Sequence, residues 1–219
     1  MKVWLAAALL LPAANSPTAA PDWPDAPLQR VEALAVLQTL NADLLSHDSA
    51  TLTLERWCAA HRIASPAVVV AERVHGVDKP ATPTIIAALK VSADVPIGYR
   101  HVRLRCGNRV LSEADNWYVP SRLTADMNHA LDTSDVAFGR AVQALHFTRH
   151  TLAADLLWSP LPEGWDMRGL PSSPRGSARM RIPGHVLEHR AVLSLPDGTP
   201  ISLVVEDYTA EVLAFPPPR

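Results

Sequence analysis

The chain has 219 residues, with 20 Lys and Arg against 22 Asp and Glu, a formal net charge of −2. This near balance argues against a general nucleic-acid binder, which carries a strongly basic domain. With 48% hydrophobic and 19% charged residues, the composition also excludes intrinsic disorder, because a chain of this kind can bury enough surface to offset its conformational entropy. We expect one globular core.

Residues 1–20 have the pattern of a secretory signal peptide. Lys2 precedes an uncharged apolar run over residues 3–11, and small residues follow. The run is too short for an ordinary transmembrane helix, so we expect a cleaved signal and a secreted or periplasmic protein with no membrane contact after cleavage. An uncleaved amphipathic anchor is the alternative. Outside the cytoplasm Cys58 and Cys106 can form one disulfide, but the sequence does not establish that they meet.

One domain is expected beyond the signal. Residues 21–27 form a proline-rich leader, residues 28–215 a single α+β domain, and residues 216–219 a tail. Within the domain, residues 159–177 hold four prolines and three glycines and look like an inserted surface loop.

Apolar periodicity predicts the elements of the first half in chain order. Leucines at helical spacing predict an amphipathic helix over residues 28–44, and polar residues 46–49 can cap a second helix that ends near residue 62. Residues 67–74 favour a strand, whereas residues 84–89 fit a short helix or a strand. Strands at 97–106 and 109–119 flank Gly107 and Asn108, a turn pair typical of a hairpin.

The second half alternates between short helices and strands. We expect helical turns within residues 121–131 and 134–145, a strand over residues 146–158, and a closing hairpin of residues 180–195 and 200–215. Helices first and antiparallel hairpins later indicate an α+β fold.

Arg100 lies on the apolar face of its predicted strand. Side chains alternate across a strand, so Arg100 shares a face with Val102 and Leu104. A guanidinium cannot shed its charge, and its burial therefore demands an anionic partner. That partner is either a core carboxylate or a ligand carboxylate in a pocket, unless Arg100 reaches solvent at the strand end.

Glu206 presents a similar feature on the last strand. It shares a face with Val204 and Tyr208, whereas Asp207 points to the other side. Burial raises the pKa of a glutamate unless a cation offsets it, and such a group can act as a general acid or base. The alternative is an ion pair with a neighbouring strand residue such as Arg190.

We expect no metal and no nucleotide cofactor. His146 and His150, like His185 and His189, are four apart, but they lie in predicted strands and lack the adjacent glutamate of a zinc helix, so surface or edge positions are expected. The solvent side of the central hairpin carries a basic strip, either a solvated face or a docking patch for an acidic partner: Arg103, Arg105 and Arg109.

Several of these segments, in this order, resemble the chorismate pyruvate-lyase family. The family's pieces read approximately LLxxDSxT, REVxLRCG, PLGR and GxPLLLTE. The matching segments are LLSHDSAT at residues 44–51, RHVRLRCG at residues 100–107, FGR at residues 138–140, and GTP at residues 198–200 followed by Glu206.

The resemblance implies an antiparallel β-sheet with N-terminal helices and helical flaps over an internal ligand pocket. It implies that Arg100 binds a substrate or product carboxylate and that Ala50 and Phe138 make backbone contacts to the ligand. It also implies that Glu206 is the inward catalytic residue, which takes part in the elimination or holds the hydroxyl end. An arginine that the family usually carries after its central helices finds no clear match in residues 146–155. Glu206 also lies one residue further from Pro200 than the family spacing.

Three functions fit these features of the sequence. The first is a chorismate lyase-like enzyme that eliminates pyruvate from chorismate to give 4-hydroxybenzoate, without a metal or organic cofactor. The second is an exported, non-catalytic binding protein for a small aromatic carboxylate on the same fold, as in the related UTRA ligand-sensing domains of some transcription regulators. The third is an interaction protein that uses the basic strip, which predicts no small-molecule pocket.

Overall fold

A computed structural model describes residues 22–172 and 178–218. The predicted signal peptide lies outside these residues. Within the described ranges, no helix combines the length and the apolar character that crossing a membrane requires.

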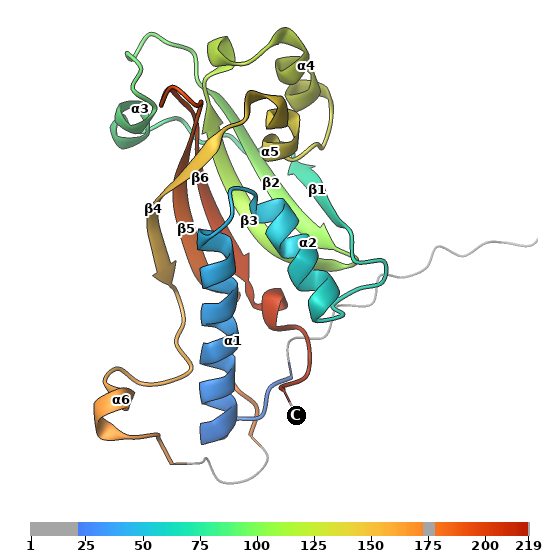
Figure 1. Ribbon diagram of the computed structural model, residues 1–219, viewed down its shortest axis with the longest axis vertical. Coiled ribbons are helices and arrows are strands. Elements are labelled where there is room, and N and C mark those ends of the chain that lie inside the picture. Colours follow the sequence, from blue (N-terminus) through green and yellow to red (C-terminus); the bar gives the residue numbers. More distant parts are fainter. Residues whose placement is uncertain (1–21, 173–177, 219) are drawn as a thin grey trace, which may run out of the picture.

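Six strands form one antiparallel sheet in the order β1-β2-β3-β6-β5-β4 (Figure 1). Hairpins join β2 to β3 and β5 to β6, as the turn signals predicted, and β6 pairs with β3 at the centre of the sheet. The α+β prediction is confirmed. The strands are β1 (Val69–Val74), β2 (Gly98–Cys106), β3 (Arg109–Tyr118), β4 (Thr148–Leu156), β5 (His185–Ser194) and β6 (Pro200–Thr209).

Helices cover both faces of this sheet. The two long N-terminal helices lie across one face, here called the inner face, and the smaller helices gather at the ends of the sheet (Figure 1). The α-helices are α1 (Pro27–Leu45), α2 (Ala50–Ala60), α3 (Pro83–Leu89), α4 (Ala125–Thr133), α5 (Phe138–Ala141) and α6 (Trp165–Arg168). Short 3-10 turns are η1 (Pro120–Arg122), η2 (Gln143–Leu145) and η3 (Ala210–Leu213).

The main core lies between the inner face and α1 with α2. Leucines of α1 at helical spacing, such as Leu37 and Leu40, are fully buried there with Leu187 of β5 and Tyr208 of β6. A disulfide joins the buried Cys58 of α2 to Cys106 of β2. This bond fixes the last turn of α2 to the end of β2.

One segment that the sequence left open between helix and strand is resolved, and two others differ from expectation. Residues 84–89 are helical, because Pro83 starts α3 and the side chain of Thr82 caps it. The expected loop at 159–177 carries α6, although residues 173–177 lie outside the described ranges. Strand β6 ends at Thr209, where the hydroxyl of that residue caps η3, so the closing hairpin is shorter than predicted.

The predicted leader is part of the folded core. Trp23 is fully buried and donates its indole N–H to the carbonyl of Leu213, at 3.0 Å. Its ring packs edge-on against Phe215. The predicted leader therefore packs against residues of the predicted domain.

Candidate functional site

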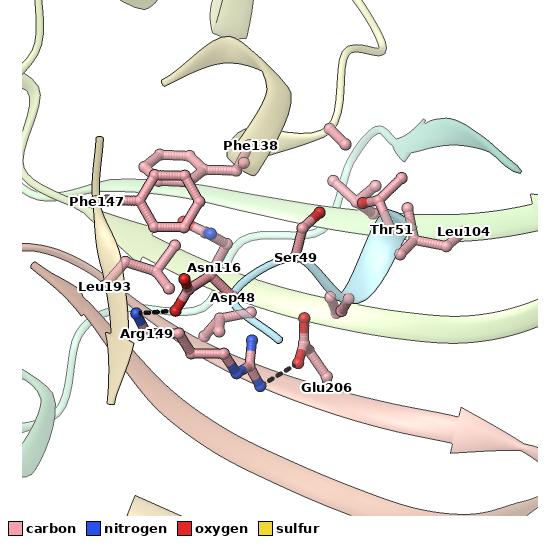
Figure 2. Close-up of a pocket in the computed structure, with 16 residues that line it drawn as sticks. Asp48, Ser49, Thr51, Leu104, Asn116, Phe138, Phe147, Arg149, Leu193 and Glu206 are labelled. Atoms are coloured by element: carbon pink, nitrogen blue, oxygen red, sulfur yellow. Dashed lines mark hydrogen bonds and ion pairs between the residues drawn. The ribbon is translucent and has the colours of Figure 1, made fainter. Parts of the chain in front are cut away.

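A small pocket opens between the start of α2, the start of α5 and the inner face of the sheet (Figure 2). Most of its wall is apolar: Ala50, Val102, Leu104, Ala114, Ala137, Phe138, Gly139, Phe147, Leu193 and Val204. The polar part of the wall is small: Asp48, Ser49, Thr51, Asn116, Arg149 and Glu206. An apolar cavity with a few converging polar groups is the usual form of a small-molecule site.

An ion pair lies in the wall of this pocket. Nη2 of Arg149 donates to Oε2 of Glu206 at 2.6 Å, and the two side chains are only 5% and 8% exposed. Burial lowers the pKa of Arg149, but the charge of Glu206 outweighs it and the pKa of Arg149 is raised. Arg149 therefore keeps its charge although it is buried.

The hydrogen bonds of Arg149 leave part of its guanidinium unused. Nε is buried without a partner among the described residues, and only Nη2 is bonded. Figure 2 shows the guanidinium of Arg149 beside the carboxylate of Glu206. Arg149 thus offers donor capacity to a group inside the pocket.

A buried network stands behind Glu206. The hydroxyl of Tyr208 donates to Oε2 of Glu206 at 3.0 Å, and burial raises the pKa of this tyrosine well above its usual range. On β5, His189 is the register partner of Glu206, is fully buried and shares a hydrogen bond of 2.8 Å with Asn41 of α1. These contacts fix the carboxylate on the inner face.

The first turn of α2 forms another part of the wall. The side chain of Ser49 caps the helix by accepting from the N–H of Leu52, at 3.4 Å. The amides of Ala50 and Thr51 precede this bond and have no intrahelical acceptor. Together with the partial positive charge of a helix start, they favour a negative group in the pocket.

A wider outer cavity continues from the pocket. The two share Asp48, Ser49, Gly139 and Phe147, and the outer cavity adds residues of α2 and of the α5–η2 segment: Leu52, Arg140, Gln143 and His146. The outer cavity is therefore the mouth of the inner pocket. Residues 137–147 form one side of that mouth.

Three of the four predicted site residues meet at this pocket. Ala50, Phe138 and Glu206 all line it. The inward orientation of Glu206 follows the alternation of β6, but its partner is Arg149 of β4, whereas Arg190 pairs with Glu188.

Arg100 lies elsewhere. It is buried as expected, at 1% exposure, but it does not line the pocket. Its Nη1 donates to the carbonyl of Val136 at 2.9 Å and its Nη2 to the carbonyl of Ser134 at 3.1 Å. The expected carboxylate partner is replaced by backbone carbonyls at the end of α4, where the helix dipole is negative.

Arg149 is the site residue that the sequence analysis missed. It lies within residues 146–155, where no arginine of the family pattern was recognised. The sequence contained a pattern that points to it. Arg149 lies in a predicted strand between Thr148 and His150, and the structure shows both of these neighbours to be exposed. Alternation alone places its side chain on the inner face.

Two other expectations are corrected. His185 is exposed as expected, but His189 is fully buried under α1. The basic strip is neutralised: Arg103 pairs with Glu113 and Arg105 with Glu72, both at 2.8 Å, and Arg109 pairs with Glu211. A docking patch for an acidic partner has no net positive charge left to use.

No family model matches the sequence. The chain belongs to the same family as uncharacterized protein y4mC of Sinorhizobium fredii (strain NBRC 101917 / NGR234). The two are 63% identical over 198 residues, which cover 90% of this chain and 83% of that protein.

Solved structures of bacterial transcription regulators show partial likeness to the fold. PhnF from Mycobacterium smegmatis is 13% identical over 80% of this chain and 70% of its own, with a TM-score of 0.48. Its effector domain is 12% identical over 74% of this chain and 88% of its own, with a TM-score of 0.46. A GntR-family regulator from Enterococcus faecalis V583 is 12% identical over 64% of this chain and 92% of its own, with a TM-score of 0.40. Structural similarity at these TM-scores gives no information about what this chain binds.

Proposed function

We propose that this chain is a chorismate lyase-like protein whose pocket binds a small aromatic or cyclic monocarboxylate. The observation that carries the proposal is the guanidinium of Arg149, which is buried beside Glu206 in an otherwise apolar pocket and keeps part of its donor capacity unused. A carboxylate accepts charge-assisted hydrogen bonds from such a group.

The charges of the pocket favour one carboxylate rather than two. Arg149 and Glu206 neutralise each other, and Asp48, which is exposed at the mouth, adds a negative charge. One carboxylate is supported by the free end of Arg149 and by the first amides of α2. A second carboxylate meets no further buried cation among the lining residues, so its desolvation would go uncompensated.

The apolar part of the pocket wall suits the ring of an aromatic ligand. Phe138 and Phe147 offer aromatic faces, and Glu206 can accept a hydrogen bond from a ring hydroxyl. An aromatic acid suits Arg149 and the two ring faces, and because Arg149 and Glu206 are in contact at 2.6 Å, a hydroxyl next to the carboxylate can also donate to Glu206. Binding without turnover is therefore the favoured function.

Chorismate lyase activity is the second candidate, and the position of Glu206 in the pocket is the observation that favours it. In that reaction the ring loses pyruvate and becomes aromatic, so the protein would mainly orient the substrate and exclude water. Chorismate carries two carboxylates, however, which the charge balance of the pocket disfavours.

One pair of assays separates the candidates. A ligand that binds only the folded state raises its melting temperature, so hydroxybenzoates should raise it and the corresponding neutral amides should raise it less. Incubation with chorismate, followed by absorbance of 4-hydroxybenzoate, tests the lyase. Product formation above background would favour catalysis, and the absence of any shift with every acid would contradict the binding proposal.

We also propose that the protein acts in a secreted or periplasmic compartment. The signal-like residues 1–20 motivate this, and a buried disulfide between Cys58 and Cys106 is compatible with an oxidising compartment. Cell fractionation with thiol labelling after denaturation tests it. Recovery of the full-length protein in the cytoplasm with two free thiols would contradict it.

A further inference from the structure

Two arginines hold the end of α4 against the edge of the sheet. Nη1 of Arg73, on β1, donates to the carbonyls of Leu131 and Asp132 at 3.2 and 3.0 Å. Arg100, on β2, binds the carbonyls of Ser134 and Val136. Between them they bind four carbonyls within residues 131–136: two in the last turn of α4, which have no intrahelical donors, and two in the residues that follow it.

A third contact strengthens this attachment. The backbone N–H of Arg73 donates to Oδ1 of Asp135 at 3.3 Å, so β1 binds the same segment through its main chain as well. Leu131 is fully buried, but the residues from Asp132 to Asp135 are exposed, and Ser134 and Asp135 lie beyond the end of α4. The two arginines therefore attach this exposed stretch to the sheet through polar contacts, between the buried Leu131 and Ala137.

The segment leads directly into the pocket wall. Ala137, Phe138 and Gly139 follow Val136 in the chain, and all three line the pocket. Phe138 packs against Tyr118 of β3, with ring centroids 5.5 Å apart. A displacement of residue 136 would therefore move Phe138 and open the side of the mouth that α5 forms.

We propose that Arg100, assisted by Arg73, is a positioning residue that holds the wall of residues 137–139 closed over the pocket and so sets how long a ligand stays bound. Its buried charge is then explained without any contact to the ligand. The part of the proposal that concerns residence time rests on the proposed function, whereas the part that concerns the wall does not.

Amide hydrogen exchange in the ligand-free protein tests the wall directly. The N–H groups of Arg140, Ala141 and Val142 bond to carbonyls at the start of α5, so their exchange reports its attachment. In Arg100→Met we expect about tenfold faster exchange at these amides, because hydrogen bonds to a charged donor are lost, and unchanged exchange in β3 and β6. Arg100→Lys, which retains the charge, should lie between Arg100→Met and the unmodified protein.

A matched control is Arg122, at the end of η1. Its guanidinium also binds backbone carbonyls, those of Leu89 at 2.7 Å, Lys90 at 3.2 Å and Pro200, but these lie outside residues 131–136, and Arg122 does not line the pocket. Arg122→Met should leave the exchange of residues 140–142 unchanged. If Arg100→Met proves too unstable to study, Arg73→Met should produce the same local pattern more weakly.

Ligand release provides the second readout. The dissociation rate of a bound hydroxybenzoate should rise about tenfold in Arg100→Met and change less than about twofold in Arg122→Met. Unchanged exchange at residues 140–142, or faster exchange spread equally over the sheet, would overturn the proposal. If no hydroxybenzoate binds any variant, the proposed function fails, and the exchange result still decides the role of Arg100.

Discussion

Arg149 and Glu206 meet at 2.6 Å although their strands, β4 and β6, are not neighbours in the sheet. Strand β5 lies between them, and on its inner face Ala191 is the residue between the register partners of Glu206 and Arg149. A small side chain at this position leaves space for a long guanidinium to cross. The pair thus joins one edge strand to the centre of the sheet and closes the pocket at the same time.

Breaking this pair should be strongly destabilising. Arg149→Met leaves Glu206 buried without its cation, and such changes cost about 3–5 kcal/mol. Arg190→Met is the matched control, since its pair with Glu188 involves a half-exposed arginine and should cost less than about 1 kcal/mol. Unfolding in denaturant measures both. The double variant Arg149→Met/Glu206→Gln should recover part of the loss, and an equal cost for the two single variants would refute the assignment.

His189 should make stability fall below neutral pH. Burial lowers the pKa of His189 below 6.5 in the folded state, against the opposing charge of Glu206. At a pH between the two pKa values, His189 is protonated in the unfolded chain but not in the folded protein. The stability that neutral His189 contributes is therefore complete above about pH 6.5 and falls below it, by at most about 1.4 kcal/mol per pH unit.

Denaturant unfolding at several pH values, in the unmodified protein and in His189→Gln, measures that contribution. The variant removes the titrating group, so its stability should depend less on pH below 6.5. The burial of His61, whose pKa is also lowered, acts equally in both proteins. Identical pH slopes would show that His189 does not titrate as proposed.

Asp207 is a site where removing a charge should stabilise the protein. Its register partners on both neighbouring strands are acidic, Glu113 on β3 and Glu188 on β5. Burial and then the charge of Glu188 raise the pKa of Asp207. Like charges directly opposite in a sheet are unfavourable, so Asp207→Asn should add about 0.2–1 kcal/mol at neutral pH.

This gain should shrink at acid pH. A raised pKa in the folded state means that the repulsion is present above the pKa of folded Asp207 and absent once that carboxyl is protonated. Asp126→Asn is the control, because it removes the same charge from the first turn of α4, where a carboxylate is favourable. Stabilisation by both variants would point to net charge rather than to the neighbours of Asp207.

The disulfide should contribute substantially to stability. Cys58 and Cys106 are 48 residues apart, and closing a loop of this size restricts the unfolded chain by about 2–4 kcal/mol. Cys58→Ala/Cys106→Ala should lower the unfolding midpoint accordingly, and reduction of the unmodified protein should give a similar loss. Since the bond holds α2 beside β2, the same variant should also weaken ligand binding. An unchanged midpoint would contradict this role.

The sequence predicted the strands and the burial of their charged residues better than the contacts of those residues. Turn residues at 107–108 and alternation along β2 and β6 were sufficient to place Arg100 and Glu206 on the inner face. The partners of Arg100 are backbone carbonyls some 34 and 36 residues away, and carbonyls carry no side-chain signature in a sequence. The motif resemblance therefore pointed to a carboxylate ligand where the fold supplies its own acceptors.

Arg149 was missed for a related reason. Its pairing with Glu206 depends on the strand order β6-β5-β4, which periodicity does not reveal. The helix cap at Ser49, in contrast, is local, and it was predicted from neighbouring residues alone.

The preference of the pocket for a carboxylate over the matching neutral amide tests the central claim most directly. Calorimetric titration of 4-hydroxybenzoate and 4-hydroxybenzamide gives this ratio for each variant. We predict that the unmodified protein prefers the acid, that Arg149→Met/Glu206→Gln loses the preference, and that Arg100→Met binds both compounds more weakly but keeps the preference. A preference that survives without Arg149 and disappears without Arg100 would contradict the account and return the carboxylate site to Arg100.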